Sequence, residues 1–343
     1  MKKIIWALPA AAMLAACGSN SANTASQIKI VGSSTVYPFT TAMAEAFQKA
    51  NPGTSVIVES TGTGAGMKLF CAGVGQNYPD IVDASRAMKR SEYDNCAKAG
   101  AKQIIEVPIG IDGLTLIESN KAQPLKLTVA DIYKALAANP FGKGPNKAQT
   151  WRDVNPALPP VKIRVLGPPP TSGTRDSLAD LILTKGCESD PAMVALKKSD
   201  EPRHKDVCTK IREDGAYVEA GENDNLLVQK VEADSGTLGV LGYSYLEQNA
   251  DKIRPVELGG VLPTEETIQS LSYPGARKLY LYVKGEHVAA KPAIAKFLAL
   301  YSQNWGKGGL LEKRGLVPFA AADASAATAQ AAALKPLDPA TLK

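Results

Sequence analysis

The stretch IKIVGSSTVYPF, from Ile28 to Phe39, contains the structural unit that recurs along the chain. Its first four residues are mostly β-branched and predict a strand, and the glycine and hydroxyl residues after them predict a tight loop. Phe39, Met43 and Phe47 then recur at the spacing of one helix face. Strand-like and helix-like runs alternate in this way along the chain, which predicts an α/β fold with a mostly parallel sheet.

The composition is that of an ordinary globular protein. The chain has 343 residues, of which 45% are hydrophobic and 21% charged, and its formal net charge is +5. These values exclude a disordered chain and a multi-span membrane protein, and the length suffices for two lobes with their own cores. The small net charge gives no reason to expect nucleic acid as a partner. Because the chain has two histidines, we expect no histidine-based metal site.

The N-terminus has the pattern of an export signal. Met1, Lys2 and Lys3 precede an apolar run that is too short to span a membrane as a helix. The run ends in LAAC at Cys17, which resembles the bacterial lipobox. We therefore expect residues 1–16 to be a signal peptide, Cys17 to carry lipid, and 17–27 to be a flexible tether at the periplasmic or cell-surface face of a membrane. A plain signal peptide cut elsewhere is the alternative.

Four cysteines remain once Cys17 is assigned to the lipid. An even remainder in an exported chain predicts two disulfides, and three pairings are possible. We expect Cys71–Cys96 and Cys187–Cys208, because these pairs close short loops; buried free thiols are the alternative. No C-x-x-C spacing occurs, so a zinc ribbon and a thioredoxin-type motif are excluded.

Four segments rich in serine, threonine and glycine each follow a predicted strand and precede a predicted helix: 32–35, 60–66, 84–86 and 171–175. Such junctions present free backbone N–H groups and the positive end of the helix dipole, which hold an oxyanion. Each segment alone is more often a helix cap. Four of them can converge, because strand ends in an open α/β sheet face one crevice. Arg86 and Arg175 would add cationic partners, unless they form surface salt bridges.

Motifs of the common enzyme classes are absent from the sequence. There is no P-loop and no G-x-S-x-G, and the glycine run at 62–66 departs from the dinucleotide fingerprint at Met67. His204 and His287 are expected to be solvated rather than catalytic. We therefore expect neither catalysis nor a cofactor.

In this order and behind a lipobox, the four segments resemble the PstS family, the phosphate-binding subunits of bacterial phosphate ABC importers, in its lipoprotein branch. The likeness rests on VGSSTVYPF (31–39), STGTGAG (60–66), DIVDASR (80–86) and PTSGTRD (170–176), and extends over roughly residues 28 to 318. It implies a type II periplasmic-binding-protein fold of two lobes. Such a protein, a monomer, closes on inorganic phosphate in the cleft between its lobes and delivers it to a membrane permease.

The resemblance also implies a ligand set. Carried over by position, the phosphate ligands would be Ser34, Thr35, Ser60, Ser85, Ser172, Gly173 and Thr174, with Arg86 and Arg175 as charged partners. The sequence departs from the family pattern twice. Arg86 stands where the family has an aspartate that accepts the proton of phosphate, and Pro168 stands where it has an arginine. The candidates for a replacement acceptor are Asp112, Asp83 and Asp224, with Asp112 preferred.

The implied domain organisation has a discontinuous first lobe, 28–110 plus 254–319, and a second lobe, 111–253, followed by an Ala-rich tail, 320–343. The chain would cross between the lobes near 108–113 and near 252–256.

Three other functions stay open. The fold could bind another oxyanion, such as sulfate, molybdate or a phosphonate. The protein could be a secreted phosphoester hydrolase with Ser85 or Ser172 as nucleophile, although no base is evident, or a surface scaffold.

Overall fold

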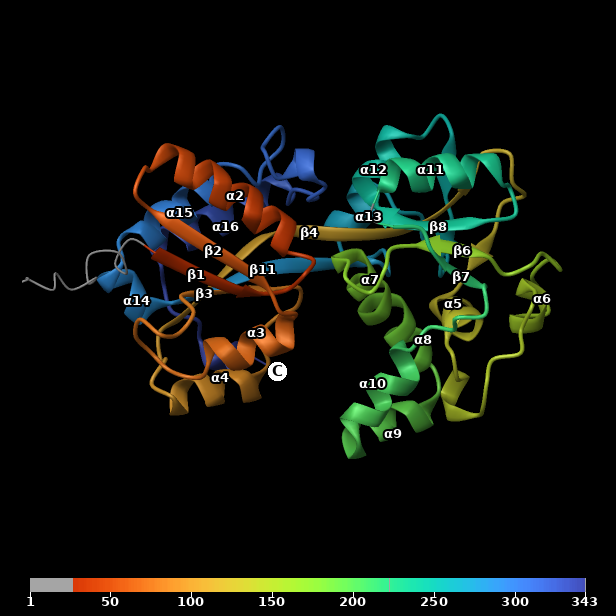
Figure 1. Ribbon diagram of the computed structural model, residues 1–343, viewed down its shortest axis with the longest axis horizontal. Helices are drawn as coiled ribbons and strands as arrows, with labels where there is room; N and C mark the ends of the chain where they lie inside the picture. Colours follow the sequence, from red (N-terminus) through yellow and green to blue (C-terminus); the bar gives the residue numbers. More distant parts are fainter. Residues whose placement is uncertain (1–26, 222, 343) are drawn as a thin grey trace, which may run out of the picture.

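Two α/β lobes lie side by side in the computed structural model, which describes residues 27–221 and 223–342 (Figure 1). Two long strands run between the lobes, β4 (Ile104–Ser119) and β11 (Ala276–Lys284). This confirms the predicted two-lobe α/β architecture. The signal peptide, the lipid site at Cys17 and nearly all of the tether lie outside the described residues.

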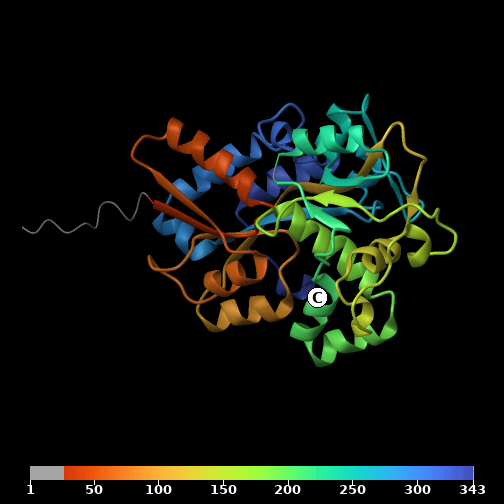
Figure 2. The ribbon, with the colours of Figure 1, turned by 45° about the vertical axis from the view of Figure 1, so that its right-hand side comes forward.

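The first lobe has three parallel strands with β1 (Gln27–Gly32) in the middle, flanked by β2 (Ser55–Ser60) and β3 (Ile81–Ala84). The register places Gly32 opposite both Ser60 and Asp83. All three strands therefore end at the same level, and the loops that follow them emerge at one edge of the sheet. From either viewpoint, that edge faces the second lobe (Figures 1 and 2).

The second lobe repeats this arrangement. Strand β6 (Val165–Gly167) lies between β7 (Tyr217–Glu219) and β8 (Leu238–Gly242), all parallel. An antiparallel strand follows in each lobe, β11 beside β3 and β4 beside β8, so the sheet is mixed. Strand β4 stays continuous through Pro108 and Gly110, with a register irregularity opposite Leu279 and Tyr280, where a proline without an N–H is tolerated.

Helices cover both faces of each sheet (Figure 1). In the first lobe they are α2 (Tyr37–Ala50), α3 (Thr63–Phe70), α4 (Arg90–Lys98), α14 (Gly285–Ala290), α15 (Ala293–Ser302) and α16 (Ala321–Ala333), with 3₁₀ turns η3 (Glu312–Arg314) and η4 (Pro339–Thr341). Phe47 of α2 packs edge-on against Phe297 of α15, with ring centroids 5.4 Å apart. This aromatic contact lies in the first-lobe core.

The second lobe and the connecting region hold α5 (Val129–Leu136), η1 (Pro140–Gly142), α6 (Trp151–Val154), α7 (Gly173–Ser177), η2 (Leu178–Leu183), α8 (Thr184–Cys187), α9 (Pro191–Ser199), α10 (Glu201–Thr209), α11 (Asp224–Ala233), α12 (Tyr243–Gln248) and α13 (Glu265–Gln269). Helix α5 begins with a capping box. The Thr128 hydroxyl accepts from the Asp131 N–H at 3.1 Å, and the Asp131 carboxylate accepts from the Thr128 N–H at 3.0 Å.

The return of the chain to the first lobe differs from the expected crossing near 252–256. There, β9 (Ile253–Pro255) pairs with the second-lobe end of β4, and β10 (Glu257–Leu258) pairs with β5 (Lys126–Leu127). Strand β11 follows later in the chain and pairs with β3 and with residues 104–113 of β4. The two disulfides, by contrast, have the expected pairing, Cys71–Cys96 and Cys187–Cys208.

The Ala-rich tail is an ordered part of the first lobe. Ala327 and Ala331, one helical turn apart on α16, are buried beside α15. Beyond the helix, the Leu337 N–H donates to the Ile104 carbonyl at 2.7 Å, and Arg90 of α4 donates to the Pro339 carbonyl at 3.2 Å. The tail therefore joins the start of β4 to helix α4. Within the described part of the chain, no helix is long and apolar enough to cross a membrane.

Replacing Ala327 with aspartate should lower the free energy of unfolding by about 2 kcal/mol or more, because it places an unpaired carboxylate against α15. The expected readout is a fall of several degrees in the melting temperature. The neighbouring Ala326 is exposed, so Ala326→Asp is the matched control and should change the melting temperature little. Equal melting temperatures for the two variants would show that the tail does not stabilise the lobe.

Candidate functional site

The loops after the first-lobe strands are tied together at Gly32. Its carbonyl accepts hydrogen bonds from the N–H groups of Thr61 and Gly62, both at 2.8 Å, and the Ser33 N–H donates to the Asp83 carbonyl at 2.9 Å. A Cβ at Gly32 would lie 2.2 Å from the Asp83 carbonyl oxygen, and φ is +134°. Only glycine allows this close approach. One residue therefore fixes the three predicted anion loops relative to one another.

The loop after β1 contacts the start of α7 in the second lobe. The Thr35 hydroxyl donates to the Gly173 carbonyl at 3.0 Å, and the Ser34 hydroxyl donates to the Asp176 carboxylate. A Cβ on Gly173 would lie 2.4 Å from the Thr35 Cα. Three of the predicted ligands thus meet where the two lobes touch.

Arg277 of β11 joins both lobes at the same place. It is buried, with 8% of its surface exposed. Its guanidinium donates to the Thr35 hydroxyl at 2.9 Å and to the Ser177 hydroxyl at 2.5 Å. It also donates to Asp112 at 3.1 Å and to Asp180 at 3.2 Å. The sequence reasoning missed Arg277; the available signal was an arginine at the second position of β11, directly before Lys278 and a largely apolar run.

Ser85 and Arg86 follow β3, as predicted, and have partners within the first lobe. The Ser85 hydroxyl lies 3.0 Å from that of Thr63, and the Ser85 N–H donates to Thr63 at 3.1 Å. Arg86 makes two hydrogen bonds to Glu92, at 2.7 and 2.9 Å. These bonds raise the pKa of Arg86. Burial alone would raise the pKa of Glu92, but its bonds from Arg86 and Lys89 hold that pKa below the usual value.

Ser172 and Arg175 are also engaged. The Ser172 hydroxyl accepts from the Thr174 N–H at 3.2 Å and so caps α7. The Arg175 guanidinium lies 4.4 Å from the centre of the Tyr217 ring and donates to the Pro168 carbonyl at 3.3 Å. Ser60, at the end of β2, is exposed. The structure therefore brings most of the predicted residues to the region between the lobes, with Ser60 at its edge.

The three predicted proton acceptors lie in different environments. Asp83 is fully buried, and burial raises its pKa well above the usual value even though Thr40 donates to it at 3.0 Å. Asp112 is paired with Arg277 and accepts from the Ser177 hydroxyl at 2.7 Å. Burial raises the pKa of Asp224, at the start of α11, to about 6. Asp176, which the sequence reasoning did not consider, contacts the predicted ligand Ser34.

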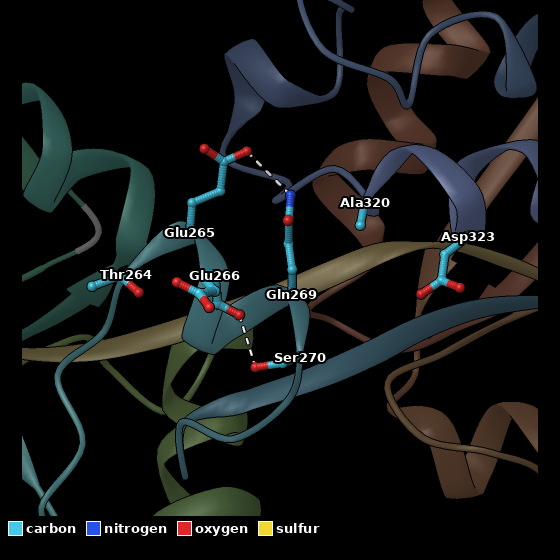
Figure 3. A pocket seen from close by; sticks show the side chains of 7 residues that line it. All are labelled: Thr264, Glu265, Glu266, Gln269, Ser270, Ala320 and Asp323. Carbon is cyan, nitrogen blue, oxygen red and sulfur yellow. Dashed lines mark hydrogen bonds between the residues drawn. The ribbon is translucent and has the colours of Figure 1, made fainter.

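A cavity of about 470 Å³ opens between the lobes beside these residues. Its lining includes Ser85, Arg86, Asp180, Arg277, Lys278 and Tyr280. Three of these side chains are cationic and one is a carboxylate, so the cavity favours an anion. A second hollow, of about 730 Å³, lies between α13 and the start of α16 and is lined by Glu265, Glu266 and Asp323 (Figure 3). Its acidic lining disfavours an anion.

Both histidines are buried, so their expected solvation is wrong. The His287 Nδ1 lies 2.7 Å from the Asp80 carboxylate, and its Nε2 accepts from the Gly75 N–H at 2.8 Å. His204 is 4% exposed and lies on α10. Among the described residues, neither imidazole hydrogen-bonds to Ser85 or Ser172, so neither serine has a histidine base in contact.

Comparisons with known proteins agree with this architecture. A family model described as a PBP superfamily domain matches residues 18–304. Protein SphX from Synechococcus elongatus is 35% identical over 306 residues, which cover 87% of this chain and 79% of SphX. The phosphate-binding protein PstS from Staphylococcus saprophyticus is 27% identical, with 88% of this chain and 85% of PstS covered.

Solved structures with a similar fold include phosphate-binding proteins. The crystal structure of a possible phosphate binding protein from Planctomyces limnophilus has a TM-score of 0.70 at 27% identity, covering 90% of this chain and 98% of that one. An ABC-type phosphate transport receptor from Vibrio cholerae shares the fold, with a TM-score of 0.59 at 20% identity and coverage of 85% and 100%. By its sequence, sheet order and inter-lobe cavity, the chain belongs to the PBP superfamily, together with SphX and PstS.

Proposed function

We propose that this protein is an extracytoplasmic solute-binding protein that captures inorganic phosphate between its two lobes and delivers it to the permease of an ABC importer. The observation that carries the proposal is the bridge made by Arg277, a buried cation that contacts hydroxyl-rich segments of both lobes beside a basic cavity. A guanidinium and convergent hydroxyl and backbone donors suit a tetrahedral oxyanion. The names of the PstS relatives support phosphate as that anion.

The proposed ligands come from both lobes: Ser34, Thr35, Ser60, Ser85, Ser172, Gly173 and Thr174, with Arg277 added at the centre. Arg86 and Arg175 already bind Glu92 and Tyr217, so we assign them to the positive field of the cleft. A ligand that touches both lobes favours the closed arrangement over the open one, and this couples capture to closure.

The strand pairing supports a changed lobe boundary. We propose that the first lobe comprises 28–110 and the chain from β11 onward, including the tail, because residues 253–258 pair with second-lobe strands. The second lobe then runs from 111 to the start of β11. The two crossings are β4 and β11, adjacent antiparallel strands that can bend together as a hinge.

Sequence, fold and site each support a further part of the proposal. The lipobox supports export and a lipid anchor at Cys17, the fold supports a monomer, and the site supports binding without catalysis. A hydrolase would need a base beside Ser85 or Ser172, and the hydroxyls of these serines are instead engaged with Thr63 and the α7 backbone. Sulfate, molybdate and phosphonate remain the competing ligands.

Selectivity for phosphate over sulfate needs an acceptor for the phosphate proton, because sulfate carries no proton near neutral pH. We propose Asp176 for this role. It already accepts a hydrogen bond from Ser34, whereas Asp112 is occupied by Arg277 and Ser177 and Asp83 lies in the lobe interior. A carboxylate there would accept from hydrogen phosphate and repel sulfate.

Arg277→Ala should weaken phosphate binding by more than about tenfold, since it removes a charge-assisted hydrogen bond. Calorimetry on ligand-stripped mature protein measures this directly. Arg203→Ala, at an exposed position on α10, is the matched control. Because Arg277 also joins the lobes, Thr35→Val serves as a second variant and should weaken binding as well. Unchanged affinity in both variants would contradict the site.

Asp176→Asn should weaken phosphate binding and strengthen sulfate binding, so that the ratio of the two affinities falls by about tenfold or more. Competition calorimetry with both anions measures the ratio. Asp323→Asn, in the outer acidic hollow, should leave it unchanged. A ratio that also stays constant in Asp176→Asn would exclude Asp176 as the selective residue without excluding phosphate binding.

Gly173→Ala should keep the lobes apart, because the added Cβ would meet the Thr35 backbone at 2.4 Å. Small-angle X-ray scattering should show that phosphate compacts the wild type but not the variant. Gly306→Ala is the control, since a Cβ there meets nothing within 4 Å. Compaction of the Gly173 variant to the wild-type radius of gyration would rule out closure through this contact.

A further inference from the structure

A second cluster of chemically reactive side chains lies in the lower part of the second lobe, where α8 and α10 run beside each other (Figure 1). The disulfide Cys187–Cys208 joins these two helices. His204 precedes Cys208 by four residues on α10, so both side chains lie on one helix face. One donor atom from each of these three residues falls within 4.8 Å of the others.

The Nε2 atom of His204 is buried without a hydrogen-bond partner among the described residues. The residue itself is 4% exposed. The nearest carboxylate oxygen, Glu188 Oε1, lies 3.3 Å away but outside hydrogen-bond geometry. Glu188 directly follows Cys187 in the chain and contacts Lys197 at 2.7 Å. A buried nitrogen that has a carboxylate at ion-pair distance but no hydrogen bond is costly and calls for an explanation.

We propose that Cys187, His204, Cys208 and Glu188 form a zinc site when the Cys187–Cys208 disulfide is reduced. Two thiolates, one imidazole and one carboxylate are a set of ligands that Zn²⁺ accepts in tetrahedral geometry. With Zn–S bonds of about 2.3 Å, the two sulfurs must separate to about 3.8 Å. The His204 nitrogen already lies within 4.8 Å of both sulfurs. Glu188, whose Oε1 lies 3.3 Å from the His204 Nε2, would have to turn toward the sulfurs to become the fourth ligand.

The redox step balances with a dithiol as the reductant. The Cys187–Cys208 bond takes two electrons and two protons from the dithiol, which closes to its own disulfide. The two free thiols then lose their protons as Zn²⁺ binds. Zn²⁺, two thiolates and the Glu188 carboxylate together carry a net charge of −1. The ammonium group of Lys197, which contacts Glu188, balances this charge.

The disulfide and the metal would thus be alternative cross-links between the same two helices. A chain that keeps Cys187 and Cys208 reduced would hold α8 and α10 together through the ion, and oxidation would release it. The other disulfide, Cys71–Cys96, is an internal comparison. Among the described residues, no histidine or carboxylate group joins it in a metal-binding cluster.

The test uses the full mature protein, reduced with a phosphine that becomes the phosphine oxide and does not supply thiol ligands. Zn²⁺ is added and excess removed, and bound metal is measured by mass spectrometry. We expect one tightly held Zn²⁺ per reduced chain, none in the oxidised chain, and a rise in the melting temperature of the reduced chain on adding Zn²⁺. Co²⁺ in place of Zn²⁺ should show a thiolate charge-transfer band.

Two variants test which residues bind the zinc ion. His204→Ala should lower zinc affinity by more than about tenfold and abolish the thermal rescue, while its disulfide still forms in the oxidised protein. The double variant Cys71→Ala/Cys96→Ala should keep both zinc and rescue. Equal zinc affinity in His204→Ala and wild type, or no zinc-dependent rise in the melting temperature of the reduced wild type, would overturn the proposal.

Discussion

The bridge formed by Arg277 is the interaction on which the arrangement of the two lobes depends. One buried guanidinium contacts the loop after β1 at Thr35, the end of α7 at Ser177, η2 at Asp180, and strand β4 at Asp112. Burying an arginine is costly unless its donors are satisfied. Here carboxylates and hydroxyls satisfy them, and those partners come from both lobes. The cost of leaving Arg277 unpaired therefore favours lobes that stay close.

The second constraint is the close packing at Gly32. Three strands end at one level because this residue accepts hydrogen bonds from the loop after β2 and leaves no room for a side chain against Asp83. The hydroxyl residues of the loops are thereby positioned by backbone contacts as well as by the hydrogen bonds of their own side chains. A site built this way is largely formed before any ligand arrives, which lowers the entropy cost of binding.

The sequence predicts the local features of this structure but not the contacts between residues far apart in the chain. Strand–loop–helix units, the Thr128 cap and the placement of the serine-rich loops follow from periodicity and capping chemistry. The role of Arg277 does not, because its partners lie more than 90 residues away in the chain. The same holds for His287, whose burial depends on Asp80, 207 residues earlier.

Long-range packing also explains two differences between the structure and the sequence-based expectations, at residues 252–256 and in the Ala-rich tail. The crossing expected near 252–256 is a short extended piece that pairs with β4, and only the full sheet distinguishes it from β11. The tail has an uninformative composition, yet a narrow stripe at Ala327 and Ala331 suffices to seat a helix on α15. Small side chains allow this close approach without any strong hydrophobic signal.

The charges in the cleft also bear on how an anion would be released. Arg277 is paired with Asp112 and Asp180, and Arg86 with Glu92, so carboxylates offset part of the positive charge that each cation offers an anion. Much of the attraction must then come from hydroxyl and backbone dipoles, which act only at short range and only when both lobes supply them. Binding that depends on geometry in this way is lost as the lobes separate. A carrier needs that property, because a site of unpaired cations would hold its anion in the open state as well.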